Sequence, residues 1–139
     1  MRSTYLPRLT LFLFTIIMSS CAGAQPEKDL PYRVQVFNEH LRWGRFDRAA
    51  EFVVPMRRSD FIAEREEQAD KVRLSECEIL SVRRGDPNTA TVRVELRWNS
   101  VDSTIVQKSI LTETWKRAGS TWFVVSMKTE SAKDKSGKK

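Results

Sequence analysis

The feature that most constrains the fold is a change in hydrophobic period near residue 72. After this point apolar and polar side chains alternate, most cleanly over residues 90–99, ATVRVELRWN. A period of two places successive side chains on opposite faces of a strand, so this segment predicts a strand with one buried and one solvated face. Strands of that kind are typical of antiparallel sheets. The second half of the chain is therefore predicted to form an antiparallel sheet.

Turn signals divide this half into four strands that follow one another as hairpins. The turns are predicted at GDPN, at NSVDS and at RAGS, which contain the Gly, Pro, Asn and Asp residues that favour reversals of the chain. The alternation slips near Ser75 and Glu76, which predicts a β-bulge in the first strand. The predicted strands are residues 72–82, 90–99, 105–116 and 121–127.

Before residue 72 the apolar period is close to 3.6. Val34, Phe37 and Leu41 recur at spacings of three and four, which predicts an amphipathic helix. Asp29 precedes this run as a candidate N-cap, and Gly44 follows it as a stop signal.

Two further helical segments precede the strands. The segment FDRAAEFVV ends at a proline, and residues 57–71 are so polar that this helix is expected on the surface. Helices followed by a meander of strands predict an α+β fold. Its N-terminal helices are expected to pack on one face of a curved, four-stranded antiparallel sheet.

The first 20 residues are predicted to be a secretion signal. Arg2 and Arg8 precede an apolar run, Leu9–Met18. A signal peptide has an apolar region of about 7–15 residues, whereas a membrane-spanning helix needs about 20. The alternative is a buried N-terminal strand or helix of the core. The order of charge, apolar run and small residues favours the signal.

The stretch FTIIMSSCAGAQ offers two cleavage sites. MSSC resembles the lipobox of bacterial lipoproteins, which predicts a lipidated Cys21 with residues 21–30 as a tether. AGA instead allows cleavage after Ala24 and a soluble periplasmic protein. The lipobox follows the apolar run directly, which favours lipidation. By resemblance to lipoproteins of bacteria with two membranes, Ala22 implies an outer-membrane lipoprotein facing the periplasm.

The charge of the chain is concentrated at its ends. The net charge is +6, but residues 21–130 contain 18 basic and 17 acidic side chains. A nearly neutral body argues against nucleic-acid binding, which needs basic residues clustered on one face. The lysine-rich tail, residues 129–139, is expected to be disordered. It is either simply solvated or in contact with anionic lipid headgroups beside the anchor.

Few side chains in the chain suit catalysis or metal binding. Cys77 has no partner once Cys21 is lipidated or removed, and we expect it to be a buried small hydrophobe rather than a redox residue or an intermolecular disulfide. His40 is the single histidine and is expected to pack at the helix rim. Neither a metal-ligand set nor a nucleotide-binding motif is present, so no metal and no cofactor is predicted.

Two stretches carry a resemblance to a known superfamily. HLRWGRFDRAAEFVVP, and TETWKRAGSTWFVVSMK with its Trp115, Gly119 and Trp122, resemble the NTF2-like superfamily over residues 31–128. The resemblance implies a cone-shaped α+β domain. The same fold is used by ketosteroid isomerases and SnoaL-type cyclases, so it is poorly specific for activity.

The tryptophans are the candidate site residues of the domain. They either line a pocket mouth or a protein interface, or they pack in the core. Arg93, Glu95 and Arg97 alternate on the polar face of their strand and are expected to form a solvated ladder. The candidate tryptophans are Trp43, Trp98, Trp115 and Trp122.

Three functions compete. The first is a lipid-anchored, non-enzymatic envelope protein that binds a protein partner or a small apolar ligand, and we favour it because no catalytic set can be aligned. The second is an exported enzyme of the isomerase or cyclase kind, which a deep pocket holding a carboxylate of raised pKa would support. The third is an assembly factor that forms a homodimer through its sheet, which a large apolar face would support.

Overall fold

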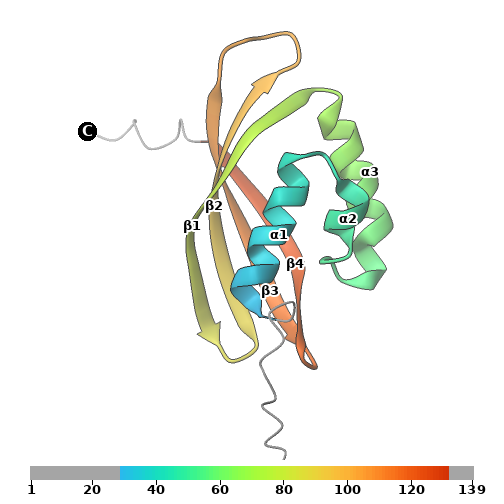
Figure 1. Ribbon diagram of the computed structural model, residues 1–139, viewed down its shortest axis with the longest axis vertical. Helices are drawn as coiled ribbons and strands as arrows, with labels where there is room; N and C mark the ends of the chain where they lie inside the picture. The colour runs from blue at the N-terminus through green and yellow to red at the C-terminus, as the bar shows by residue number, and fades with distance from the viewer. Residues whose placement is uncertain (1–28, 132–139) are drawn as a thin grey trace, which may run out of the picture.

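The computed structural model describes residues 29–131 of the 139-residue chain (Figure 1). The predicted signal, Cys21, and the tail beyond residue 131 lie outside the described residues. In the described part, helices come first: α1 is Leu30–Arg42, α2 is Phe46–Ala50, and α3 is Arg58–Ala69 after a 3-10 turn at Pro55–Arg57. The strands follow: β1 is Val72–Asp86, β2 is Thr89–Ser100, β3 is Gln107–Ala118 and β4 is Thr121–Ser131.

The strands form one antiparallel sheet in the order β1-β2-β3-β4, and the helices cover one face of it (Figure 1). This is the predicted α+β architecture. The predicted bulge is also present, because Leu74 pairs with Trp98 and Glu76 pairs with Arg97, which leaves Ser75 as the extra residue. Bulges increase local twist, and this sheet is visibly curved around the helices (Figure 1).

The strands begin and end at other residues than predicted where polar side chains interrupt the alternation of apolar and polar residues. β1 continues to Asp86 and β4 to Ser131, so the domain extends past its predicted end at residue 128 and takes in the first residues of the predicted tail. β3 begins at Gln107 rather than at Ile105, which is 71% exposed. The Ser103 hydroxyl accepts the Ile105 N–H at 3.1 Å, and this local hydrogen bond keeps the segment in a loop.

The second helix is shorter than its apolar run. α2 ends at Ala50, and the chain then turns so that the Val124 N–H donates to the Phe52 carbonyl at 2.9 Å. The Val54 N–H donates to the Val124 carbonyl at 3.3 Å, and Val53 forms a parallel bridge with Val124. The predicted helix over FDRAAEFVV is therefore wrong in its second half, where these residues protect the edge of β4 instead.

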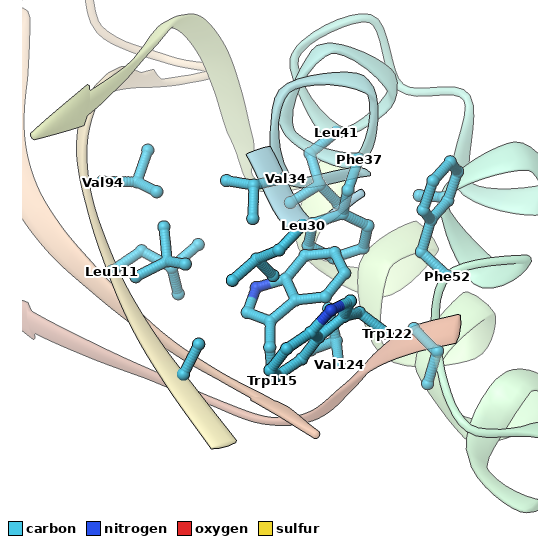
Figure 2. Close-up of a cluster of buried hydrophobic side chains, with 14 of the residues drawn as sticks. Leu30, Val34, Phe37, Leu41, Phe52, Val94, Leu111, Trp115, Trp122 and Val124 are labelled. Atoms are coloured by element: carbon cyan, nitrogen blue, oxygen red, sulfur yellow. The ribbon is translucent and has the colours of Figure 1, made fainter. Parts of the chain in front are cut away.

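The core lies between α1 and the covered face of the sheet (Figure 2). Phe37 is at its centre and is fully buried. Its ring meets Trp115 edge-on, with centroids 5.6 Å apart at 89°, and it also contacts the rings of Phe52 and Phe61. The predicted stripe of α1 is confirmed, because Val34, Phe37 and Leu41 all face the sheet.

The polar third helix lies on the surface as predicted, and Phe61 is its buried residue. Within residues 29–131, no helix has both the length and the apolar content that a membrane crossing needs.

Candidate functional site

The candidate site is a cavity of about 620 Å³ between the helices and one end of the sheet. Along β2, Ala90, Val92 and Val94 are fully buried, whereas Leu96 and Trp98 on the same face are half-buried. The helices therefore cover one end of the sheet tightly and leave the apolar face uncovered toward the other end. The cavity occupies that space, and its volume is within the range of small-molecule sites, about 300–1,000 Å³.

Its walls are mainly apolar. The apolar residues of the helical side include Leu41, Phe46 and Ala69, and those of the sheet side include Trp98 and Leu111. Trp98 is held in place because its indole N–H donates to the Ser109 hydroxyl at 2.9 Å, and Ser109 also lines the cavity. The indole donor is therefore satisfied within the wall, and the ring presents its apolar surface to the cavity.

Arg65 is the most enclosed of the charged side chains that line the cavity, since it is half-buried whereas Arg42 and Arg73 are exposed. Its Nη1 donates to the Gln68 side-chain oxygen at 2.9 Å, and its guanidinium carbon lies 5.6 Å from the centre of the Phe61 ring. Its Nε is buried and has no hydrogen-bond partner among the described residues. Burial lowers the pKa of Arg65, because a partly apolar setting disfavours the charged form, and Glu64 partly opposes that effect.

The four candidate tryptophans occupy three different environments. Trp98 lines the cavity. Trp115 and Trp122 are 0% and 4% exposed and belong to the core, so for these two residues core packing, and not a pocket mouth or an interface, is the alternative that the structure supports. Trp43 is 59% exposed and does not line the cavity, and its ring lies 5.2 Å from the Arg42 guanidinium carbon. A role for Trp43 in a protein interface stays a prediction.

Glu113 is the most deeply buried acid in the described part of the chain, and it is not among the site residues predicted from the sequence. It is fully buried on β3, between Leu111 and Trp115 on the inward face. The Trp115 indole N–H donates to Glu113 Oε2 at 2.8 Å. Asn38 also lies close enough to favour the charged carboxylate, but its amide N–H is aligned on the Val34 carbonyl, and Glu113 Oε1 has no aligned donor.

Burial raises the pKa of Glu113 to about 7, against the opposing effects of the Trp115 hydrogen bond and the nearby Asn38 amide. A signal for this residue was present in the sequence. The alternation of Leu111, Glu113 and Trp115 places all three on one face of the strand. Glu113 does not line the cavity, although Leu111 on the same strand does.

His40 packs against a neighbouring ring, as predicted, whereas Cys77 is half-buried and not fully buried as predicted. The His40 ring lies 6.1 Å from that of Phe52. Cys77 is half-buried against the core, and burial raises the pKa of its thiol to about 12, with a further contribution from the Glu113 charge. A thiol of that kind is largely protonated at neutral pH, which argues against redox chemistry. No cluster of His, Cys, Asp and Glu side chains suitable for a metal ion is found among residues 29–131.

The outward face of the sheet carries part of the predicted ladder of charges. Glu95 and Arg97 form ion pairs there, whereas Arg93 is exposed and forms no salt bridge with a described residue. Arg97 bridges Glu76 at 2.8 Å and Glu95 at 3.4 Å, and Lys108 contacts Glu95 at 2.9 Å. A homodimer through this part of the sheet would have to desolvate these charges.

Solved structures with this arrangement come from several bacteria. A SEC-C motif containing protein from Rhodopseudomonas palustris superposes with a TM-score of 0.62 at 14% identity, covering 75% of this chain and 80% of that chain. Bd1075 from Bdellovibrio bacteriovorus gives 0.52 at 14% identity, covering 74% of this chain and 39% of that one. A proposed dehydratase of the NTF2-like family from Streptomyces avermitilis gives 0.50 at 14% identity, covering 71% and 94%.

The fold is NTF2-like. These similarities, at such low identity, concern the fold alone. No protein-family model matches the sequence, and no curated protein matches it. The NTF2-like domain of this chain thus has its helices and curved sheet in the expected arrangement, with the cavity between them.

Proposed function

We propose that this chain is a non-catalytic binding protein of the cell envelope whose NTF2-like domain takes a small, mainly apolar ligand. The observation that carries the proposal is the cavity of about 620 Å³, walled by apolar side chains from both the helices and the sheet. Concave, mostly apolar sites with a few polar groups are the usual form of small-molecule sites. Trp98 supplies the large aromatic surface in this one.

The position of Glu113 supports a binding role over catalysis. An enzyme of the isomerase kind needs a titratable group that reaches its substrate in an apolar pocket. Glu113 has the raised pKa, but its side chain is fully buried against Trp115 and away from the cavity lining.

An exported enzyme is the second candidate, and the raised pKa of Glu113 is the observation that favours it. It would require the carboxyl group to reach a bound ligand. Ligand affinity that changes near pH 7 in the wild type and loses this change in Glu113→Gln would support the enzyme over the simple binder.

The envelope location rests on the sequence. We propose that a lipidated Cys21 holds the chain to the outer membrane, and that residues 22–29 connect this anchor to the first helix. Stable attachment needs about two acyl chains or equivalent signals, which a lipoprotein modification supplies. The domain would then meet its ligand, or a protein partner, on the periplasmic side.

Filling the cavity tests the binding function. Ala69 is exposed at the end of α3 and lines the cavity, so Ala69→Trp should occupy the space without removing a core side chain. Ala63 is an exposed alanine of the same helix that does not line the cavity, and Ala63→Trp is the matched control. Both are made in the full chain carrying Cys21→Ser, so that no acyl chain or detergent competes for the site.

The probe is N-phenyl-1-naphthylamine, a neutral aromatic amine whose fluorescence rises in an apolar environment. We expect the parent chain to bind it, Ala69→Trp to weaken binding at least about tenfold, and Ala63→Trp to bind like the parent. No binding by the parent, or equal binding by all three proteins, would contradict the proposed function.

A further inference from the structure

The lining of the cavity has one sign of charge. Arg42 at the end of α1, Arg65 on α3 and Arg73 on β1 all line it, and no acidic side chain of the described residues does. None of the three forms a salt bridge with a described carboxylate. By contrast, Arg97 and Arg48, on other surfaces, are paired with glutamates.

Arg65 is the arginine best suited to hold an anion. The Arg65 side chain is half-buried, and its guanidinium group lies over the Phe61 ring. Its buried Nε has no hydrogen-bond partner within the described residues. A buried donor without a partner is costly, and a charged acceptor would recover that cost. The planar guanidinium group also binds carboxylates through two parallel hydrogen bonds, which gives selectivity as well as strength.

Arg42 and Arg73 contribute positive electrostatic potential at the cavity, but they do not enclose a ligand. Both side chains are exposed, and the Arg42 Nε donates to the Ser75 carbonyl at 3.1 Å, which fixes its stem beside the bulge of β1. Positive charges grouped at a cavity whose walls have a low dielectric constant raise the local concentration of anions. An anion that reaches Arg65 therefore approaches through a positive field.

We propose that the cavity takes an amphipathic carboxylate, whose apolar body lies against Trp98 and Leu111 and whose anionic head pairs with Arg65. This inference rests on the proposed binding function and names its ligand class. The apolar walls alone would accept a neutral chain of the same length. The arginine is what distinguishes the anion from its neutral counterpart.

The test compares decanoate with 1-decanol, which have the same chain length and differ in the charge of the head. Binding of each to the full chain carrying Cys21→Ser is measured by isothermal titration calorimetry, below the concentration at which decanoate self-associates. We expect decanoate to bind about tenfold to a hundredfold more tightly than decanol, since hydrogen bonds to charged groups contribute on that order.

Three variants locate the effect. Arg65→Met should bring the affinity for decanoate down to that for decanol and leave decanol binding unchanged. Arg83→Met removes an exposed arginine of β1 that does not line the cavity. It changes the net charge by the same amount as Arg65→Met, and it should alter the affinity for neither decanoate nor decanol. Arg65→Lys keeps the positive charge but loses the planar guanidinium group, so it should retain part of the preference for decanoate over decanol. This variant also provides a test if Arg65→Met fails to fold.

The outcomes separate this inference from the function on which it rests. Equal affinity of the parent chain for decanoate and decanol, or a loss of both in a folded Arg65→Met, would overturn the choice of an anionic ligand and leave an apolar binder. Failure of both compounds to bind the parent chain, while N-phenyl-1-naphthylamine binds, would also overturn it. Failure of all three compounds would overturn the binding function itself.

Discussion

At the residue scale, the inward face of β3 shows how one side chain departs from the pattern around it. Leu111 and Trp115 are buried apolar residues, and Glu113 between them is fully buried as well. Burying a carboxylate without full hydrogen bonding is costly, so the group adapts by raising its pKa to about 7. The unsatisfied oxygens of Glu113 and Asn38 mark this as the least compensated place in the core.

Glu113 makes stability depend on pH in a defined direction. Its pKa is about 7 in the folded protein, against about 4.3 in an unfolded chain. Between these values the folded state binds more protons than the unfolded state, so the free energy of unfolding falls as the pH rises through this window. Glu113→Gln keeps the shape of the side chain and an acceptor for the Trp115 N–H, but it does not titrate. We therefore expect the variant to lack this fall in the free energy of unfolding, and at pH 8 the pH-dependent loss in the wild type should exceed that in the variant by on the order of 3 kcal/mol.

The measurement is urea unfolding followed by tryptophan fluorescence at several pH values between 5 and 8, for wild type and Glu113→Gln. Comparing the two proteins cancels the contributions of the titratable groups that they share. Parallel stability profiles for the two proteins would mean that Glu113 does not change protonation in this range.

At the scale of elements, the hairpin between β3 and β4 depends on one backbone conformation. Gly119 has a φ of 62°, in the left-handed region that side chains with a Cβ disfavour. A Cβ added there would meet no atom within 4 Å, so any cost of substitution comes from backbone strain. Gly85, near the end of β1, is equally open and lacks a positive φ.

These two glycines make a matched pair. We expect Gly119→Ala to lower the free energy of unfolding by about 1 kcal/mol, and Gly85→Ala to change it by less than about 0.5 kcal/mol. Thermal and urea unfolding of the two variants beside the wild type provide the measurement. Equal effects from both substitutions would show that the turn does not require the left-handed conformation.

At the scale of the whole molecule, the curved sheet and the helices leave a cavity at one end because the helices do not cover the full length of the long strands. The same arrangement buries Trp115 and Trp122 and exposes Trp43. The proposed envelope location is a separate property, because the segments on which it rests lie outside residues 29–131.

The membrane tether is tested by the intact mass of the mature protein from purified membranes, compared with Cys21→Ser. We expect a chain that begins at Cys21 and carries acyl chains, and we expect this form to disappear in the variant because the thiol is the acceptor. A soluble product that begins at Gln25 would instead establish cleavage after Ala24. The domain would then be a diffusible periplasmic protein.

What the sequence determined was the set of elements and their order. Period and turn chemistry are local properties, so neighbouring residues were enough to predict the first helix, the stop signal at Gly44 that follows it, the bulge at Ser75 and the four strands. The tertiary structure decided what each apolar or charged residue faces. Phe52 leaves its helix because an edge strand offers hydrogen bonds, and Trp98 lines a cavity while Trp115 does not, because the helices cover only one end of the sheet. Likewise, Arg42, Arg65 and Arg73 meet at one cavity from three separate elements, a grouping that arises only when the helices close over the sheet.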